Sequence, residues 1–182
     1  MRIPRTVSPV IAGAFAWRDA ALVQVPRPAA DWVRDPASLT HRLRARGSFS
    51  VRPLTQSVRA PRPDEQRLLS QQPRQWALIR EVLLHLDGRP VVHARSVLPL
   101  ASLRGANRRL AHMAQRSLGA ELFRAPAARR RAVWLARVPA HTLPAETGTR
   151  EPVWGRQSLF LKRGAPLLVA EFFLPTLWDS TS

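Results

Sequence analysis

The stretch WALIREVLLHLDGRPVVHARSVLPL (residues 76–100) carries the clearest structural signal in the chain. Two apolar runs flank Asp87-Gly88, a pair that favours the two-residue type I′ turn of a β-hairpin. The stretch VWGRQSLFLKRGAPLLVAEFFL (residues 153–174) shows the same arrangement around Arg163-Gly164. Because a hairpin joins antiparallel neighbours, the chain is predicted to form an antiparallel sheet.

Helices and further strands are predicted around these two hairpins. Ser38 suits the N-cap of a helix over LTHRLRAR, and Gly47 suits its end. The other predicted elements are strands at residues 49–58 and 130–138, short helical segments at 29–34, 61–73 and 107–115, a loop or helix end at 116–123, and a loop at 139–152. This order predicts an α+β fold, with one domain over residues 28–178 after a loosely ordered lead-in over residues 1–27.

Length and composition narrow the class of protein. The chain has 182 residues, of which 45% are hydrophobic, and this is enough for a domain with a proper core. It contains no cysteine, so disulfides and thiolate chemistry are excluded. No apolar run approaches the roughly 20 residues of a membrane span, and no convincing export signal precedes the fold. We therefore expect a cytoplasmic protein, without a transmembrane segment.

The net charge of +17 points to an anionic partner, either nucleic acid, an acidic surface or a small anion. The chain has 29 basic residues, and Lys162 is the only lysine among them. Many of the arginines are expected to be solvated, including the run Arg129, Arg130 and Arg131. The aromatic residues do not alternate with basic ones as in a single-strand binding surface, so nucleic-acid binding is disfavoured.

Glu171 is the one carboxylate in the apolar stretch PLLVAEFFLP (residues 166–175). A carboxylate that loses its hydration is costly unless a partner or a proton compensates. Counting outward from Arg163-Gly164 places Glu171 opposite Arg156. Glu171 is therefore either a structural ion-pair partner or the working group of an acid–base site.

The first hairpin adds further positive charge to this picture. Counting from Asp87-Gly88 places Arg80 opposite Arg95, with His93 on the same face. Like charges directly opposite each other destabilise a sheet, so a small dianion bound by the arginines would balance them. Glu81 is expected on the other face, at the surface, and Glu121 is expected to be exposed. The histidines show no spacing typical of a metal site.

Four segments together resemble the chorismate pyruvate-lyase family of ubiquinone biosynthesis. They are DWVRDPASLTHRLRARG (residues 31–47), WALIREVLLHLDGRPVVHARSVLP (76–99), RSLGAELF (116–123) and WGRQSLFLKRGAPLLVAEFFLP (154–175), and they occur in the family's order. The resemblance implies a single antiparallel sheet of about six strands with helices and helix-turn flaps packed on it. It also implies an enclosed site, no metal or organic cofactor, and cleavage of chorismate to 4-hydroxybenzoate and pyruvate, with tight binding of the product.

The resemblance further implies which residues hold the ligand. The family's binding arginine falls on Arg80 and its glutamate on Glu171, both with catalytic roles. Main-chain contacts fall on Leu118 and on Leu39, where other members carry methionine. Arg95 and Arg156 are expected to support the site, while Gln157 replaces a second arginine that often follows Trp-Gly in the family.

Two other functions remain open at this point. Related folds serve as effector-binding modules of transcription regulators, which would bind a small anion without converting it. A basic nucleic-acid-binding protein is the third reading, supported by the charge alone. The expected partners are the substrate chorismate and the product 4-hydroxybenzoate, and the protein is expected to be a monomer.

Overall fold

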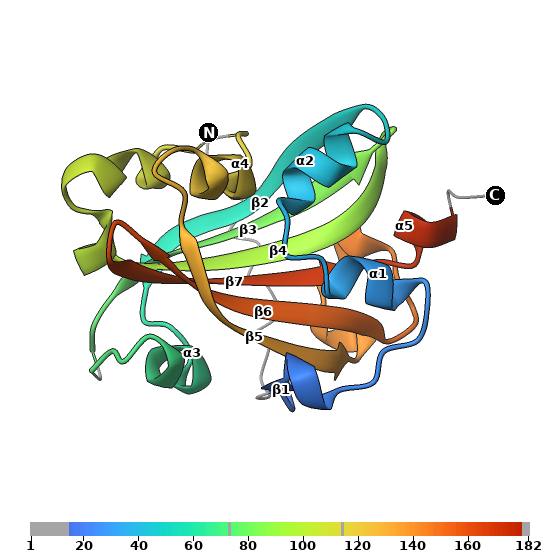
Figure 1. The fold of residues 1–182 in the computed structure, drawn as a ribbon, viewed down its shortest axis with the longest axis horizontal. Coiled ribbons are helices and arrows are strands. Elements are labelled where there is room, and N and C mark those ends of the chain that lie inside the picture. Colours follow the sequence, from blue (N-terminus) through green and yellow to red (C-terminus); the bar gives the residue numbers. More distant parts are fainter. Residues whose placement is uncertain (1–14, 73, 114, 180–182) are drawn as a thin grey trace, which may run out of the picture.

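The computed structural model describes residues 15–72, 74–113 and 115–179, and within them it contains one antiparallel sheet. The sheet has seven strands in the order β1-β5-β6-β7-β4-β3-β2 (Figure 1). The strands are β1 (Arg18–Asp19), β2 (Phe49–Arg59), β3 (Ala77–Leu86), β4 (Arg89–Pro99), β5 (Arg129–Val138), β6 (Val153–Lys162) and β7 (Ala165–Phe173). The predicted α+β class is confirmed; the sheet has the six long strands expected and the two-residue β1 in addition.

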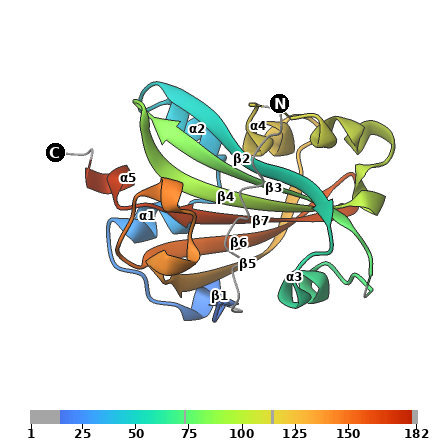
Figure 2. The same ribbon diagram turned by 180° about the vertical axis from the view of Figure 1, so that it is seen from behind.

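Short helices cover both faces of the sheet. The α-helices are α1 (Ala29–Val33), α2 (Leu39–Arg44), α3 (Pro63–Leu68), α4 (Leu118–Phe123) and α5 (Thr176–Asp179). Figure 1 shows α1, α2 and α4 in front of the sheet, and Figure 2 shows α3 on the opposite side. Short 3-10 helices occupy Ala20–Leu22, Leu100–Leu103, Gly105–Ala111, Ala140–Thr142 and Ala145–Thr147. We call the face under α1, α2 and α4 the front face, and the other the back face.

Several helix boundaries differ from the predicted ones. Ser38 caps α2 as expected, and its side chain accepts a hydrogen bond from the His41 N–H. The helix ends at Arg44, two residues before the predicted end at Arg46. Residues 107–115 were expected to form a helix, but a 3-10 helix over Gly105–Ala111 lies there. Residues 116–123 contain the true helix α4.

The β6–β7 hairpin follows the predicted register. Arg163 and Gly164 have φ angles of 52° and 78°, as the type I′ turn requires. The ladder then runs without interruption, so Lys162 lies opposite Ala165 and Arg156 lies opposite Glu171.

The β3–β4 hairpin has the predicted turn but not the predicted register. Leu84 pairs with Val92 and His85 pairs with Pro90, which leaves Val91 as an extra residue in β4. Pro90 has no N–H to give to the ladder, and prolines within sheets are tolerated at such bulges. Beyond the bulge every partner shifts by one, so the predicted Arg80–Arg95 pair is wrong. Arg80 lies opposite Ser96, and Arg95 lies opposite Glu81.

This shift sends Arg95 to the back face, where it joins a buried ion network. Its guanidinium donates to Glu65 of α3 at 2.7 and 3.0 Å and to Glu81 of β3 at 2.7 Å. His93 lies beside them, with its Nε2 3.4 Å from Glu81, and stacks on Phe172. Glu81 is therefore buried and paired rather than at the surface, and His93 and Arg95 do not share the face of Arg80.

The first described residues pack against the sheet. Phe15 and Trp17 contact Phe172 on the back face, and β1 pairs with β5 through Arg18 and Leu135. Residues 1–14 of the predicted lead-in lie outside the described residues, and the domain boundary at residue 27 stays a prediction. Within the described ranges, no helix is long and apolar enough to cross a membrane.

Candidate functional site

A pocket lies on the front face, between the sheet and the helices α2 and α4. Its free space, open mouth included, is about 520 Å³. The floor is formed by side chains of β3, β4 and β7, with apolar residues around a few charged ones. Among the lining residues are Leu39, Arg80, Leu118, Phe160 and Glu171. The four residues that the family resemblance assigns to ligand contact thus line one pocket.

Arg80 enters the pocket from β3 and is almost completely buried. Its Nη2 donates to the carbonyl of Arg116, in the segment before α4, at 3.0 Å. Burial lowers the pKa of the Arg80 guanidinium, but an arginine stays charged in proteins. The pocket therefore holds a desolvated positive charge, which favours a carboxylate ligand.

Glu171 enters from the neighbouring region of the floor and forms the expected ion pair with Arg156. The Nε of Arg156 donates to Oε2 of Glu171 at 2.7 Å. Arg156 is 1% exposed, and its Nη1 donates to the carbonyls of Asp35 and Trp32 at 2.7 and 3.3 Å. The Glu171 side chain is 13% exposed and lines the pocket, whereas Arg156 lies behind it. Arg156 thus acts on the pocket through Glu171.

The helices α2 and α4 form the two flaps over the pocket. Leu39 and Leu118 are the first residues of these helices, where backbone N–H groups have no intrahelical partner. The hydroxyls of Thr40 and Ser117 form a hydrogen bond that joins the flaps. A Cβ at Gly119 would lie 2.7 Å from the Thr40 hydroxyl, so a larger residue there would displace this hydroxyl.

Lys162 fixes the other end of the α4 flap. It is the last residue of β6, it is 1% exposed, and its ammonium sits among four backbone carbonyls. These carbonyls belong to Glu121, Leu122, Arg124 and Pro126, at 2.8 to 3.2 Å. A cation at the carbonyl end of a helix satisfies groups that the helix leaves open. Glu121 is also buried, contrary to the prediction, with Arg109 and Arg124 each 3.5 Å away.

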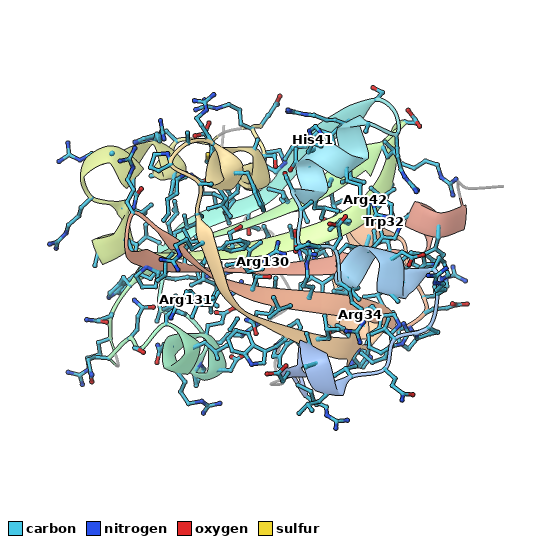
Figure 3. The ribbon with its side chains drawn as sticks, in the orientation of Figure 1. Trp32, Arg34, His41, Arg42, Arg130 and Arg131 are labelled. Carbon is cyan, nitrogen blue, oxygen red and sulfur yellow. The ribbon has the colours of Figure 1, made fainter. Side chains whose placement is uncertain are left out.

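Arg130 is a pocket residue that the sequence prediction missed. The ladder between β5 and β6 shifts between Arg130 and Ala132, so a bulge at Arg131 separates the two arginines. Arg130 lines the pocket and lies over the middle of the sheet (Figure 3), whereas Arg129 and Arg131 are exposed. The prediction of a solvated run is thus wrong for Arg130. Regular alternation along β5 would have placed Arg131 on this face, and the sequence gives no clear local signal for the bulge.

The residues predicted for support separate into two groups. Arg156 contacts the site through Glu171, while Arg95 lies on the back face and does not line the pocket. Gln157, which replaces the family's second arginine, is buried in β6 next to Arg156. Within the described ranges, no group of three or more His, Asp or Glu side chains is placed to hold a metal ion.

These features define a class by its fold: α+β domains in which short helices pack on one open antiparallel sheet. Solved structures of this class include the effector domain of PhnF from Mycobacterium smegmatis, with a TM-score of 0.59 over 77% of this chain and 90% of that chain. A GntR-family transcriptional regulator from Bacillus cereus gives a TM-score of 0.54 over 71% and 94%. Their sequence identities of 19% and 9% show a shared fold.

Sequence relatives identify the family within this class. The chorismate lyase family model matches residues 12–182. A relative from Alcanivorax borkumensis, named "probable chorismate pyruvate-lyase", is 54% identical over 165 residues, which cover 90% of this chain and 77% of the relative. A relative of the same name from Azoarcus sp. is 47% identical over 157 residues, or 80% and 83% of the two chains. The chain belongs to the chorismate lyase family.

Proposed function

We propose that this protein is a chorismate pyruvate-lyase, which cleaves chorismate to 4-hydroxybenzoate and pyruvate and so supplies the ring of ubiquinone. One observation carries the proposal beyond family membership. Arg80 and Glu171, together with the first residues of both flaps, line a single pocket. A desolvated cation and a carboxylate in one pocket match a ligand that has a ring carboxylate and a ring hydroxyl.

The reaction requires little covalent work from the protein. The ether bond between the ring and the enolpyruvyl group breaks, and its electron pair leaves with the enolpyruvate oxygen. The neighbouring ring carbon, which carries the hydroxyl, loses its hydrogen as a proton, and the ring becomes aromatic. Enolpyruvate takes up a proton on its methylene carbon and becomes pyruvate. Because aromatisation drives this change, catalysis rests on positioning and on proton transfer.

Four pocket residues and Arg156 have roles in this scheme. Arg80 binds the ring carboxylate, and Glu171 accepts a hydrogen bond from the ring hydroxyl and assists the proton transfer. Backbone N–H groups at Leu39 and Leu118 hold carboxylate oxygens as the flaps close. Arg156 keeps the Glu171 carboxylate in position through the 2.7 Å bond to its Oε2. We place this activity in the cytoplasm and in a monomer, as expected from the sequence.

Incubation of the purified protein with chorismate tests the proposal directly. We expect equal amounts of 4-hydroxybenzoate, followed by ultraviolet absorbance after chromatography, and of pyruvate, followed with lactate dehydrogenase. An effector module would instead bind 4-hydroxybenzoate or chorismate and leave chorismate intact. A salt-dependent gel shift without turnover would favour the nucleic-acid reading.

A further inference from the structure

Arg130 lines the pocket, and one nitrogen of its guanidinium has no hydrogen-bond partner among the described residues. Its Nη1 donates to the carbonyls of Asp35 and Pro36 at 3.3 and 3.2 Å, in the loop that precedes α2. Its Nε is buried, and it has no hydrogen-bond partner in the described part of the chain. A buried donor without a partner is costly, and few occur in a protein, so this one requires an explanation.

The charge balance of the pocket points to an anion as the missing partner. Arg156 is neutralised by Glu171, and its Nη1 donates to two backbone carbonyls. Two of the described arginines line the pocket: Arg80 donates to the carbonyl of Arg116, and Arg130 donates to the carbonyls of Asp35 and Pro36. Burial lowers the pKa of Arg130, and the neighbouring Arg156 lowers it further, while Glu171 and Asp35 act in the opposite direction. An anionic group beside Arg130 would relieve this destabilised charge.

Chorismate carries two carboxylates, one on the ring and one on the enolpyruvyl group. The ether oxygen and the ring hydroxyl are bonded to neighbouring ring carbons. A substrate whose ring carboxylate meets Arg80 and whose hydroxyl meets Glu171 therefore carries its enolpyruvyl group at the Glu171 end of the pocket. Arg130 reaches this end from β5, whereas Arg80 comes from β3, four strand spacings or roughly 19 Å across the sheet.

We propose that Arg130 binds the carboxylate of the enolpyruvyl side chain through its Nε edge. This rests on the proposed lyase activity. It means that Arg130 distinguishes the substrate, which has two carboxylates, from 4-hydroxybenzoate, which has one. A guanidinium edge can hold a carboxylate through two parallel hydrogen bonds. Arg130 thereby orients the leaving group, and its charge also lies close to the oxygen that becomes negative when the ether bond breaks.

The test compares substrate and product affinity in Arg130→Gln. We expect the KM for chorismate to rise at least about tenfold, the effect of losing a charge-assisted hydrogen bond. The dissociation constant of 4-hydroxybenzoate, measured by calorimetry, should change less than about threefold. The matched control is Arg131→Gln, an exposed arginine one residue away, for which both values should stay as in the unmodified protein. The conservative variant Arg130→Lys, which keeps the charge but loses the bidentate edge, should lie between the two.

A parallel loss of affinity for chorismate and for 4-hydroxybenzoate would mean that Arg130 only holds the loop at Asp35 and Pro36, and an unchanged KM would equally overturn the proposal. The unmodified protein provides a test that needs no variant. It should bind 3-(carboxymethoxy)-4-hydroxybenzoate at least about tenfold more tightly than the neutral amide of its side-chain carboxyl group. Equal affinities would rule out a cationic subsite. These binding ratios can be measured even if chorismate is not turned over, so failure of the lyase activity and failure of the subsite are distinguishable.

Discussion

Arg156 and Glu171 neutralise each other at the base of the pocket, and this pair shows how one glutamate can serve both stability and function. Glu171 would be costly in an apolar strand without Arg156, and its Oε2 accepts the 2.7 Å hydrogen bond. No hydrogen bond to its Oε1 is found in the described part of the chain, and the side chain lines the pocket. The ion pair thus positions the carboxylate without using all of its capacity to accept hydrogen bonds.

Glu171→Gln should lower kcat for chorismate cleavage by roughly 100-fold or more, the usual scale for a lost acid–base group. Glutamine keeps an oxygen that can accept from Arg156, so the fold should survive, as checked by circular dichroism and thermal unfolding. Glu151→Gln, at an exposed site, is the matched control and should be unchanged. Near-normal turnover in Glu171→Gln would remove Glu171 from the catalytic scheme.

Arg80→Gln should raise both the KM for chorismate and the dissociation constant of 4-hydroxybenzoate by about 10- to 100-fold, because both ligands carry the ring carboxylate. This parallel change differs from the selective effect expected for Arg130. Arg89→Gln, an exposed arginine of the same hairpin, serves as the control. If 4-hydroxybenzoate binds Arg80→Gln as tightly as the unmodified protein, the ring carboxylate lies elsewhere.

The ion network on the back face makes stability depend on pH. Burial alone would raise the pKa of Glu81, but His93 and Arg95 outweigh it and lower the pKa to about 2. Glu65 also has a lowered pKa, because its hydrogen bond and ion pair with Arg95, together with Arg62, outweigh its burial. Since the ionised forms are favoured in the folded state, the stability from Glu81 is present above the unfolded value of 4.5 and is lost as the pH falls toward 2.

The free energy of unfolding should therefore decrease between pH 5 and pH 2, with Glu81 contributing about 3 kcal/mol. Urea unfolding at several pH values measures this decrease. Glu81→Gln should be less stable at pH 7, because Arg95 loses an ionic partner, and its stability should depend less steeply on pH in this range. An unchanged slope in Glu81→Gln would contradict the assignment, and the exposed Glu151→Gln should keep the full slope.

Two β-bulges, at Val91 and Arg131, limited how well the positions of the side chains could be predicted from the sequence. The Arg163-Gly164 turn and the uninterrupted β6–β7 ladder made the Arg156–Glu171 pairing predictable. The bulge at Val91 moved Arg95 to the back face, and the bulge at Arg131 brought Arg130 to the pocket. A one-residue insertion reverses every side chain beyond it, and local sequence signals for bulges are weak. The hydrogen bond between the two flaps could not be predicted, because Thr40 and Ser117 are far apart in the sequence.

Helix α4 has six residues, and isolated helices of this length are unstable in water, so its attachments determine its position. Lys162→Met should lower the free energy of unfolding by about 2 to 4 kcal/mol, because several carbonyls lose a buried donor. It should also weaken 4-hydroxybenzoate binding through the displaced flap. Thermal unfolding and calorimetry measure the two effects. Arg163→Met, at the exposed neighbouring turn, is the control. If Lys162→Met were as stable as the unmodified protein, Lys162 would not be what holds the end of α4.

At the scale of the whole molecule, the chain carries a net charge of +17, and its proposed substrate is a dianion. Such a field attracts anionic substrate, and salt screens it over about 8 Å at physiological ionic strength. Raising the sodium chloride concentration from about 20 to about 300 mM should lower kcat/KM several-fold, mainly through KM. Steady-state kinetics at saturating and limiting chorismate separate the two constants. A kcat/KM that does not depend on salt would show that the surface charge serves another purpose.

The burial of the single lysine has a practical consequence for chemical labelling. In the folded state, amine-reactive dyes can reach Lys162 only after its ammonium leaves the four carbonyls at the end of α4. The side chain would then react at a rate set by local opening of the flap, as in hydrogen exchange. The rate of Lys162 acetylation, followed by mass spectrometry, would therefore measure how often the pocket opens. Addition of 4-hydroxybenzoate should slow the acetylation of Lys162, because the bound ligand holds the flap closed.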